Sequence, residues 1–203
     1  MFLNTQTDFA NALPVEMAAL MRPADTKLSG FVTGTKVETA FGWRAVETLT
    51  RGDAVHTLDG GLRVAQQVNR RTLSVDRALH VPGGVLGNCA DMVLMPGQSV
   101  LIETDLAEGA FGAPMVLVPA AALAGFRGIS WVSLAHRNTK ALEVIELGFA
   151  EEEVVFAESG VLLGCYGAEA DTGKRSYYKH LTLDQGQALI GLLIHGSPFD
   201  LAA

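Results

Sequence analysis

Short apolar runs, separated at close intervals by turn residues, are the feature that most restricts how this chain can fold. Between Ser29 and Tyr166 most apolar runs are only a few residues long and end near glycine, proline or aspartate. The segment Asp59-Gly60-Gly61, for example, separates two such runs and is a strong hairpin signal. Many short runs with turns between them favour strands over helices. We therefore predict an all-β fold for residues 29–166.

The predicted strands follow these runs, and Leu62 to Leu73 alternates well enough to form one long strand. The others are Gly34 to Thr39, Ala54 to Leu58, Leu79 to Val81, Met92 to Leu94, Val100 to Thr104, Gly128 to Leu134, Ala141 to Phe149 and Val154 to Ala157. One helical turn is expected over Ala45 to Leu49, and Pro119 is expected to open a short helix over Ala120 to Leu123.

The two ends of the chain depart from this pattern. Residues 1–28 carry apolar residues close to helical spacing around Pro14, which predicts a short helical arm, with a frayed tail as the alternative. Leu183 to Ile194 predicts a C-terminal helix with Thr182 as its N-cap. The expected division is an arm (1–28), a β domain (29–166) and a C-terminal helical extension (167–203).

Composition argues against several classes of function. The 203 residues carry a formal net charge of -7 and no basic run longer than Arg70-Arg71, so we expect no nucleic-acid partner. No apolar run approaches the roughly 18 residues of a membrane span, and no secretory signal pattern opens the chain. We expect a cytoplasmic protein without a membrane contact.

The cysteines and histidines give no sign of a metal or cofactor. Cys89 and Cys165 are too few for a disulfide framework, and we expect two reduced, buried thiols. The five histidines are scattered without the spacing of zinc ligands. The acidic run Glu151-Glu152-Glu153, with Glu158 nearby, predicts a solvated loop, with cation or partner binding as the alternative.

Three blocks of the chain follow a recognisable pattern in a fixed order. The second is Val81 to Asn88 followed by Met92 to Ile102, and the third is Glu152 to Ala157. The first lies between Gly30 and Thr57, and its matching positions are Phe31, Gly34, Thr35, Val37, Thr39, Val46, Glu47, Leu49, Gly52, Asp53 and Val55. Together the blocks resemble the Hint family of hedgehog autoprocessing domains and inteins, and most closely its stand-alone bacterial members.

This resemblance implies a horseshoe-like all-β fold and, in active members, an acyl shift. A cysteine or serine attacks the carbonyl of the residue before it, and a histidine of the second block protonates the departing amide nitrogen. In this chain the nucleophile position falls on Gly30 and the acid position on Gln98 or Ser99. The histidine of the third block is replaced by Glu152.

These substitutions imply a Hint domain without self-cleavage, and we do not expect an enzyme. Glycine has no side chain, and neither glutamine nor serine titrates near neutral pH. The favoured function is a scaffold or interaction module that binds a protein partner. One alternative is self-cleavage near Ser29-Gly30 by an altered mechanism, using Ser29, Cys89 or Glu152. Another is self-association through the terminal helices.

Overall fold

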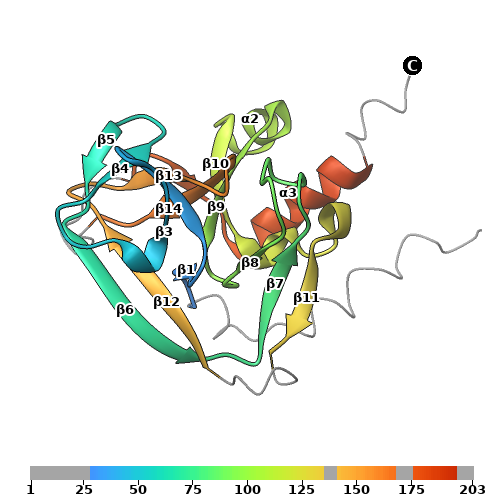
Figure 1. Cartoon of the computed structure of the whole chain (residues 1–203). Helices are drawn as coiled ribbons and strands as arrows, with labels where there is room; N and C mark the ends of the chain where they lie inside the picture. Colours follow the sequence, from blue (N-terminus) through green and yellow to red (C-terminus); the bar gives the residue numbers. More distant parts are fainter. Residues whose placement is uncertain (1–27, 135–140, 168–175, 196–203) are drawn as a thin grey trace, which may run out of the picture.

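Strands dominate the computed structural model, which describes residues 28–134, 141–167 and 176–195 (Figure 1). The all-β prediction is therefore confirmed. The strands are β1 (Phe31–Val32), β2 (Lys36–Thr39), β3 (Gly42–Ala45), β4 (Ala54–Thr57), β5 (Gly61–Val64), β6 (Gln67–Ser74), β7 (Arg77–Val81), β8 (Met92–Leu94), β9 (Ser99–Glu103), β10 (Met115–Pro119), β11 (Ser130–Ser133), β12 (Ala141–Gly148), β13 (Glu153–Ala157), β14 (Val161–Cys165) and β15 (Lys179–His180). The helices are α2 (Asp105–Phe111), α3 (Leu183–His195) and the 3-10 turns η2 (Val46–Thr48), η3 (Ala120–Leu123) and η4 (Phe126–Gly128).

Three sheets build the described part of the domain. The largest has nine strands in the order β15-β10-β9-β14-β13-β2-β4-β5, with β3 paired to β2. A second sheet has the order β1-β12-β6, in which β6 and β12 form a long curved antiparallel ribbon (Figure 1). The third has the order β11-β7-β8 and lies on the opposite side from that ribbon in Figure 1.

One large apolar cluster joins the sheets and the C-terminal helix. Val100, Val118 and Leu163 of the nine-stranded sheet are buried in it, and Leu189 and Ile190 bring α3 into the same cluster. Burying one such side chain stabilises the fold by roughly 1.5–3 kcal/mol. The helical segment after residue 176 therefore shares its core with the β domain, while the predicted domain boundary after Tyr166 stays a prediction.

The α3 prediction is confirmed, including its N-terminal cap. The Thr182 hydroxyl accepts a hydrogen bond from the Gln185 N–H at 3.3 Å, and the Gln185 side chain accepts one from the Thr182 N–H at 3.0 Å. This reciprocal pair satisfies two N–H groups at the helix start. Gly186, which weakens a helix intrinsically, lies against η3, where an added Cβ would come within 2.8 Å of the Ala122 Cβ. Close packing explains this glycine.

The single long strand predicted over Leu62 to Leu73 is wrong. β5 ends at Val64 and β6 begins at Gln67. Between them, the buried Ala65 donates its N–H to the Asp53 carbonyl at 2.9 Å and accepts a hydrogen bond from the Gly52 N–H at 2.9 Å. The backbone changes its hydrogen-bonding partner here. β5 pairs with β4, Ala65 bonds the turn at Gly52 and Asp53, and β6 pairs with β12. A continuous alternation of side chains in the sequence therefore does not produce one continuous strand.

A helix over residues 105–111 was not predicted. Its signals are present at both ends: the Thr104 side chain accepts a hydrogen bond from the Leu106 N–H at 3.4 Å, and Gly112 ends the helix with a φ of 73°. Both are standard capping residues. The helix has only seven residues and contains Gly109, which hides its period. The short helical turns predicted near Val46 and Ala120 are confirmed as η2 and η3.

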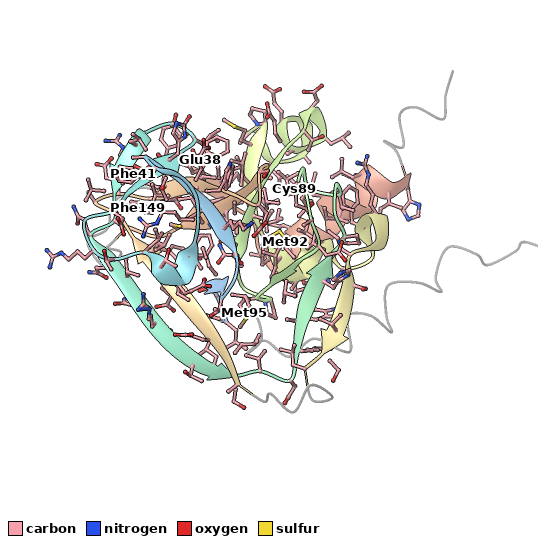
Figure 2. All side chains as sticks on the ribbon, in the orientation of Figure 1. Glu38, Phe41, Cys89, Met92, Met95 and Phe149 are labelled. Atoms are coloured by element: carbon pink, nitrogen blue, oxygen red, sulfur yellow. The ribbon has the colours of Figure 1, made fainter. Side chains whose placement is uncertain are left out.

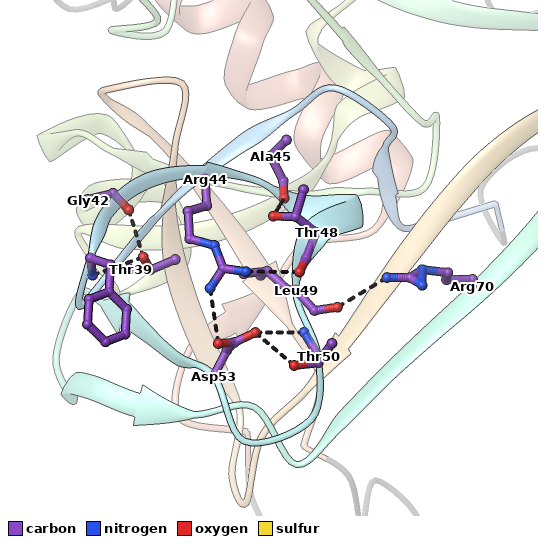
Figure 3. A network of polar contacts seen from close by, with 10 residues as sticks. Thr39, Gly42, Arg44, Ala45, Thr48, Leu49, Thr50, Asp53 and Arg70 are labelled. Carbon is purple, nitrogen blue, oxygen red and sulfur yellow. Dashed lines mark hydrogen bonds and ion pairs between the residues drawn. The ribbon is translucent and has the colours of Figure 1, made fainter.

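A network around Asp53 fixes the turn that precedes β4 (Figure 3). The Arg44 guanidinium donates to the Asp53 carboxylate at 3.0 Å and to the Thr48 carbonyl at 2.9 Å. The other carboxylate oxygen accepts from the Thr50 N–H at 2.7 Å and from its hydroxyl at 3.1 Å. The main-chain hydrogen bond from Thr50 is the largest influence and, with Arg44, holds the pKa of Asp53 below its usual value. These contacts agree with a structural role for Asp53.

Candidate functional site

Gly30 immediately precedes β1 and lies against β12. The following residue, Phe31, pairs with Ile145 of β12. Gly30 has a φ of 121°, a conformation that residues with a side chain rarely adopt. A Cβ placed on it would lie 3.2 Å from the Val144 Cβ and 3.4 Å from the Ile145 carbonyl oxygen. Both the backbone conformation and the packing at this position therefore favour a residue without a side chain.

Gln98 is the side chain that meets Gly30. Its Oε1 accepts a hydrogen bond from the Gly30 N–H at 3.1 Å, although 68 residues separate the two along the chain. Its Nε2 donates to the carbonyls of Gly164 at 2.9 Å and Ser99 at 3.2 Å. Gln98 is 3% exposed. Since two carbonyls require the donor end of the amide, the network fixes the acceptor end toward Gly30.

The orientation of Gln98 decides what this site can do chemically. The Gly30 nitrogen belongs to the Ser29–Gly30 peptide bond, the bond that family chemistry would break. Expelling that nitrogen requires a group that delivers a proton to it. Here the neighbouring group is a carbonyl oxygen, which only accepts. The second candidate for the acid position is Ser99, whose hydroxyl lies 3.5 Å from the Tyr166 hydroxyl.

Tyr166 and His180 connect the Gln98–Ser99 segment to Glu152. The Tyr166 ring stacks on the His180 ring with 6.0 Å between centroids and an interplanar angle of 17°. The His180 Nε2 is hydrogen-bonded to the Glu152 Oε1. The four positions indicated by the resemblance, Gly30, Gln98, Ser99 and Glu152, thus belong to one series of contacts. Tyr166 and His180, which were not selected from the sequence, join Ser99 to Glu152.

Glu152 is held by several donors and stays ionised. Its Oε2 accepts hydrogen bonds from the Ser176 hydroxyl at 2.6 Å and from the N–H groups of Tyr177 and Tyr178 at 3.0 and 3.3 Å. Burial by itself would raise the pKa of this carboxyl. The hydrogen bonds from Ser176, His180 and Tyr178 outweigh that effect, so the pKa lies below its usual value. An ionised carboxylate cannot serve as the missing proton donor at neutral pH.

The prediction of a solvated loop over Glu151 to Glu153 is wrong for two of the three residues. Glu152 is held as described above. Glu153 begins β13, is 8% exposed and pairs with the Arg63 Nε at 3.2 Å. Glu151 alone is exposed. Carboxylates that are buried need such partners, because an unpaired buried charge is costly.

Of the residues that an altered cleavage mechanism would use, Ser29 adjoins Gly30 and Cys89 contacts another segment. Ser29 is half-buried and lies one residue out of register. Cys89 precedes β8, whereas Met95 and the Gln98 segment follow that strand; Figure 2 shows Cys89, Met92 and Met95 in succession. The Cys89 thiol is exposed and accepts a hydrogen bond from the Ser159 hydroxyl at 3.4 Å. The prediction that Cys89 is buried is therefore wrong.

Cys165 is buried, as predicted, at the end of β14. Both cysteines are free thiols in the structure. Burial, followed by the charge of Glu153, raises the pKa of the Cys165 thiol far above its usual value, which keeps it protonated and unreactive. Within the described ranges, no group of three or more His, Cys, Asp and Glu side chains is placed to hold a metal ion.

Comparison with known proteins identifies the fold that carries this site. A family model described as the Hint domain matches residues 29–167, more than half of the chain. The chain belongs to the Hint family. A Hint domain is related to self-splicing and autoprocessing domains, which is the class that the three sequence blocks indicate.

Two solved structures similar to this Hint domain are a split intein and an intein-like domain. One is a splice-inactive variant of the AceL NrdHF class 3 split intein, with 15% identity and a TM-score of 0.47 over 69% of this chain and 99% of that one. The other is a bacterial intein-like domain from Clostridium thermocellum, with 15% identity and a TM-score of 0.49 over 66% of this chain and 97% of that one. The comparison with curated proteins found no match.

The described helices of this Hint domain are short. α3, the longest, has 13 residues, and none in the described part of the chain has the length and apolar character needed to cross a bilayer.

Proposed function

We propose that this Hint domain does not cleave its own chain and serves instead as a scaffold or interaction module for a protein partner. The observation that carries the proposal is the contact between Gly30 and Gln98. The nitrogen that a cleavage reaction would have to protonate already donates its hydrogen to an amide oxygen. The residue that would have to attack has no side chain.

The other candidate groups support the same conclusion. Glu152 has a lowered pKa and four hydrogen-bonding partners, so it is poorly suited to deliver a proton. Cys89 precedes β8, while the Gln98 segment follows it, and Cys89 contacts the turn between β13 and β14 through Glu158 and Ser159.

Intact mass spectrometry tests this proposal. The full-length protein is incubated for several days at neutral pH with dithiothreitol, and in parallel with hydroxylamine, which captures thioesters and esters. We expect the mass of residues 1–203 to remain unchanged in both samples. A fragment that begins at Ser29 or Gly30 would show that the chain cleaves itself and would overturn the proposal.

The variant Gly30→Cys sharpens this test, because it supplies the thiol without supplying a proton donor. We expect Gly30→Cys also to remain intact, since the added side chain meets Val144 and the Gln98 oxygen still faces the Gly30 nitrogen. Cleavage of this variant alone would mean that only the nucleophile is missing. Circular dichroism of both proteins controls for misfolding of the variant.

Self-association through the terminal segments is the second candidate. Ile194, near the end of α3, is 49% exposed although the same helix buries Leu189 and Ile190. Residues 1–27 of the predicted arm (1–28) lie outside the described residues. Removing residues 1–28 should then change the oligomeric state in size-exclusion chromatography with light scattering, and an unchanged mass in solution would exclude a role for the arm.

A further inference from the structure

A cavity of about 880 Å³ opens beside the series of contacts that runs from Gly30 to Glu152. Glu152, Tyr166 and His180 line it, together with the strand residue Arg63 and the residues around Tyr178. A smaller cavity of about 330 Å³ contains Ser99 and shares Tyr166 and His180 with the large one. The stacked pair of rings is therefore a wall between the two cavities. A concavity of this size is large enough for several ligand side chains.

Aromatic faces form part of the wall of the large cavity. Tyr177 is 75% exposed and Tyr166 is 51% exposed, which is high for aromatic residues of a folded domain. The Tyr177 ring meets the buried Tyr178 ring at 83° with 5.0 Å between centroids. The Tyr178 hydroxyl donates to the Asp59 carboxylate, so its ring is fixed in place. The rings of Tyr177 and Tyr178 thus form a corner whose accessible side is the Tyr177 ring.

The same cavity carries an excess of negative charge. Among the described residues that line it, the carboxylates are Asp59, Glu151, Glu152 and Glu153, and Arg63 is the single guanidinium. Arg63 is already paired with Glu153. With His180 neutral, the net formal charge of this lining is -3. A ligand that entered as an anion would be repelled, whereas a cation would meet both the carboxylates and the electron-rich faces of the tyrosines.

We infer that this cavity binds lysine or arginine side chains of a partner polypeptide. This inference deepens the proposed interaction function, on which it rests, because it names the chemistry of the partner. The aromatic corner takes the charged end over the Tyr177 face, the one open to solvent. At the opening of the cavity, the carboxylates compensate the positive charge of the lysine or arginine side chain. Glu151 contributes most because it is exposed. No covalent step is involved.

Nuclear magnetic resonance titration of the full-length protein tests the inference. The probe is acetyl-Gly-Lys-Lys-Gly-amide, and the control peptide replaces both lysines by norleucine, which keeps the aliphatic chain and removes the charge. We expect saturable shifts of the signals of Tyr166, Tyr177 and His180 with the lysine peptide and none with the control peptide. Equal shifts with both peptides would overturn the inference.

Two single-residue variants assign the binding to this cavity. Tyr177→Ala removes one aromatic face and should raise Kd about threefold to fivefold, the range of one exposed cation–π contact. Glu151→Gln removes one exposed charge and should raise Kd about twofold, with a weaker dependence on salt. The matched controls are Phe41→Ala, a residue 86% exposed outside the cavity, and Glu108→Gln on α2. If the controls weaken binding as much as the cavity variants, the site lies elsewhere.

The chain itself carries two adjacent cations next in sequence to a residue of the cavity lining. Lys174 and Arg175 immediately precede Ser176 in the sequence. The titration is therefore repeated on the variant Lys174→Ser/Arg175→Ser, in which these cations are absent. Tighter binding by this variant supports the inference, and absence of binding in both proteins overturns it. Neither result depends on self-cleavage, which is read separately from the intact mass.

Discussion

The main-chain nitrogen of Gly30 and the side-chain oxygen of Gln98 lie 3.1 Å apart and join the start of β1 to the turn before β9. A second contact supports the first, since the Gly97 N–H donates to the Leu28 carbonyl at 2.8 Å. In the Hint fold this junction lies where active relatives are expected to carry out their chemistry. Here it consists of satisfied hydrogen bonds, so we expect its residues to affect stability more than reactivity.

Replacing Gln98 by leucine should lower the free energy of unfolding by about 2–3 kcal/mol. The substitution keeps most of the volume but leaves the Gly30 N–H and the Gly164 carbonyl without partners, and each buried unpaired group costs roughly 1–3 kcal/mol. Urea denaturation measures the change. Gln66→Leu, at an exposed position between β5 and β6, is the control and should stay within about 0.5 kcal/mol of the wild type. Equal effects would mean that the buried network contributes nothing.

Replacing Gly30 by alanine should destabilise the fold through two separable effects. The φ of 121° strains any residue with a Cβ, at about 1–3 kcal/mol, and the new methyl group also meets Val144 at 3.2 Å. Gly34→Ala is the matched control, because its φ is 94° and nothing lies within 4 Å of the added Cβ. The larger loss of thermal stability should occur at Gly30. A larger loss at Gly34 would contradict the packing described here.

Gly160→Ala should be among the most damaging glycine substitutions. An added Cβ at residue 160 would lie 2.3 Å from the Gly87 carbonyl oxygen, so two backbone segments would have to separate. Overpacking of this kind costs about 1–3 kcal/mol. Gly191→Ala in α3, with nothing within 4 Å, should instead be neutral or stabilising, since alanine favours a helix by about 1 kcal/mol over glycine. Differential scanning calorimetry of the two variants gives the comparison.

Glu152 should contribute to the acid sensitivity of the protein. Its pKa is lower in the folded chain than the ordinary value of 4.5, so its stabilising effect is complete above that value and is lost as pH falls through the folded pKa. The free energy of unfolding of Glu152→Gln should therefore lie below that of the wild type at neutral pH, with the two curves converging at acidic pH. Glu108→Gln controls for the loss of one negative charge. Parallel curves for Glu152→Gln and wild type would refute this role.

Asp53→Ala should lower stability by about 1–2 kcal/mol, as measured by urea denaturation, because the turn before β4 loses its acceptor for the Thr50 N–H and its partner for Arg44. Asp53→Asn keeps one oxygen acceptor and should cost less. If both substitutions cost the same, the negative charge, rather than the acceptor geometry in Figure 3, holds the turn.

Several features of the site could be predicted from the sequence and others could not. The blocks around Gly30, Gln98 and Glu152 carry family patterns, so their relevance is visible without a structure. Tyr166 and His180 carry no such pattern. They become neighbours because β15, which contains His180, pairs with β10 in the same sheet as β14, and Tyr166 lies at the end of β14. No local sequence signal specifies this pairing of β15 with β10.

The sequence by itself determined the strand-rich fold, the hairpin at Asp59 to Gly61 and the α3 cap at Thr182. Turns and helix caps depend on interactions between residues two to four apart, so they can be recognised in the sequence. Only the tertiary structure decided that β5 and β6 separate at Ala65 and that the Gln98 oxygen faces the Gly30 nitrogen. Both depend on which groups from distant parts of the chain form hydrogen bonds with one another, and those pairings are fixed only when all the strands are in register.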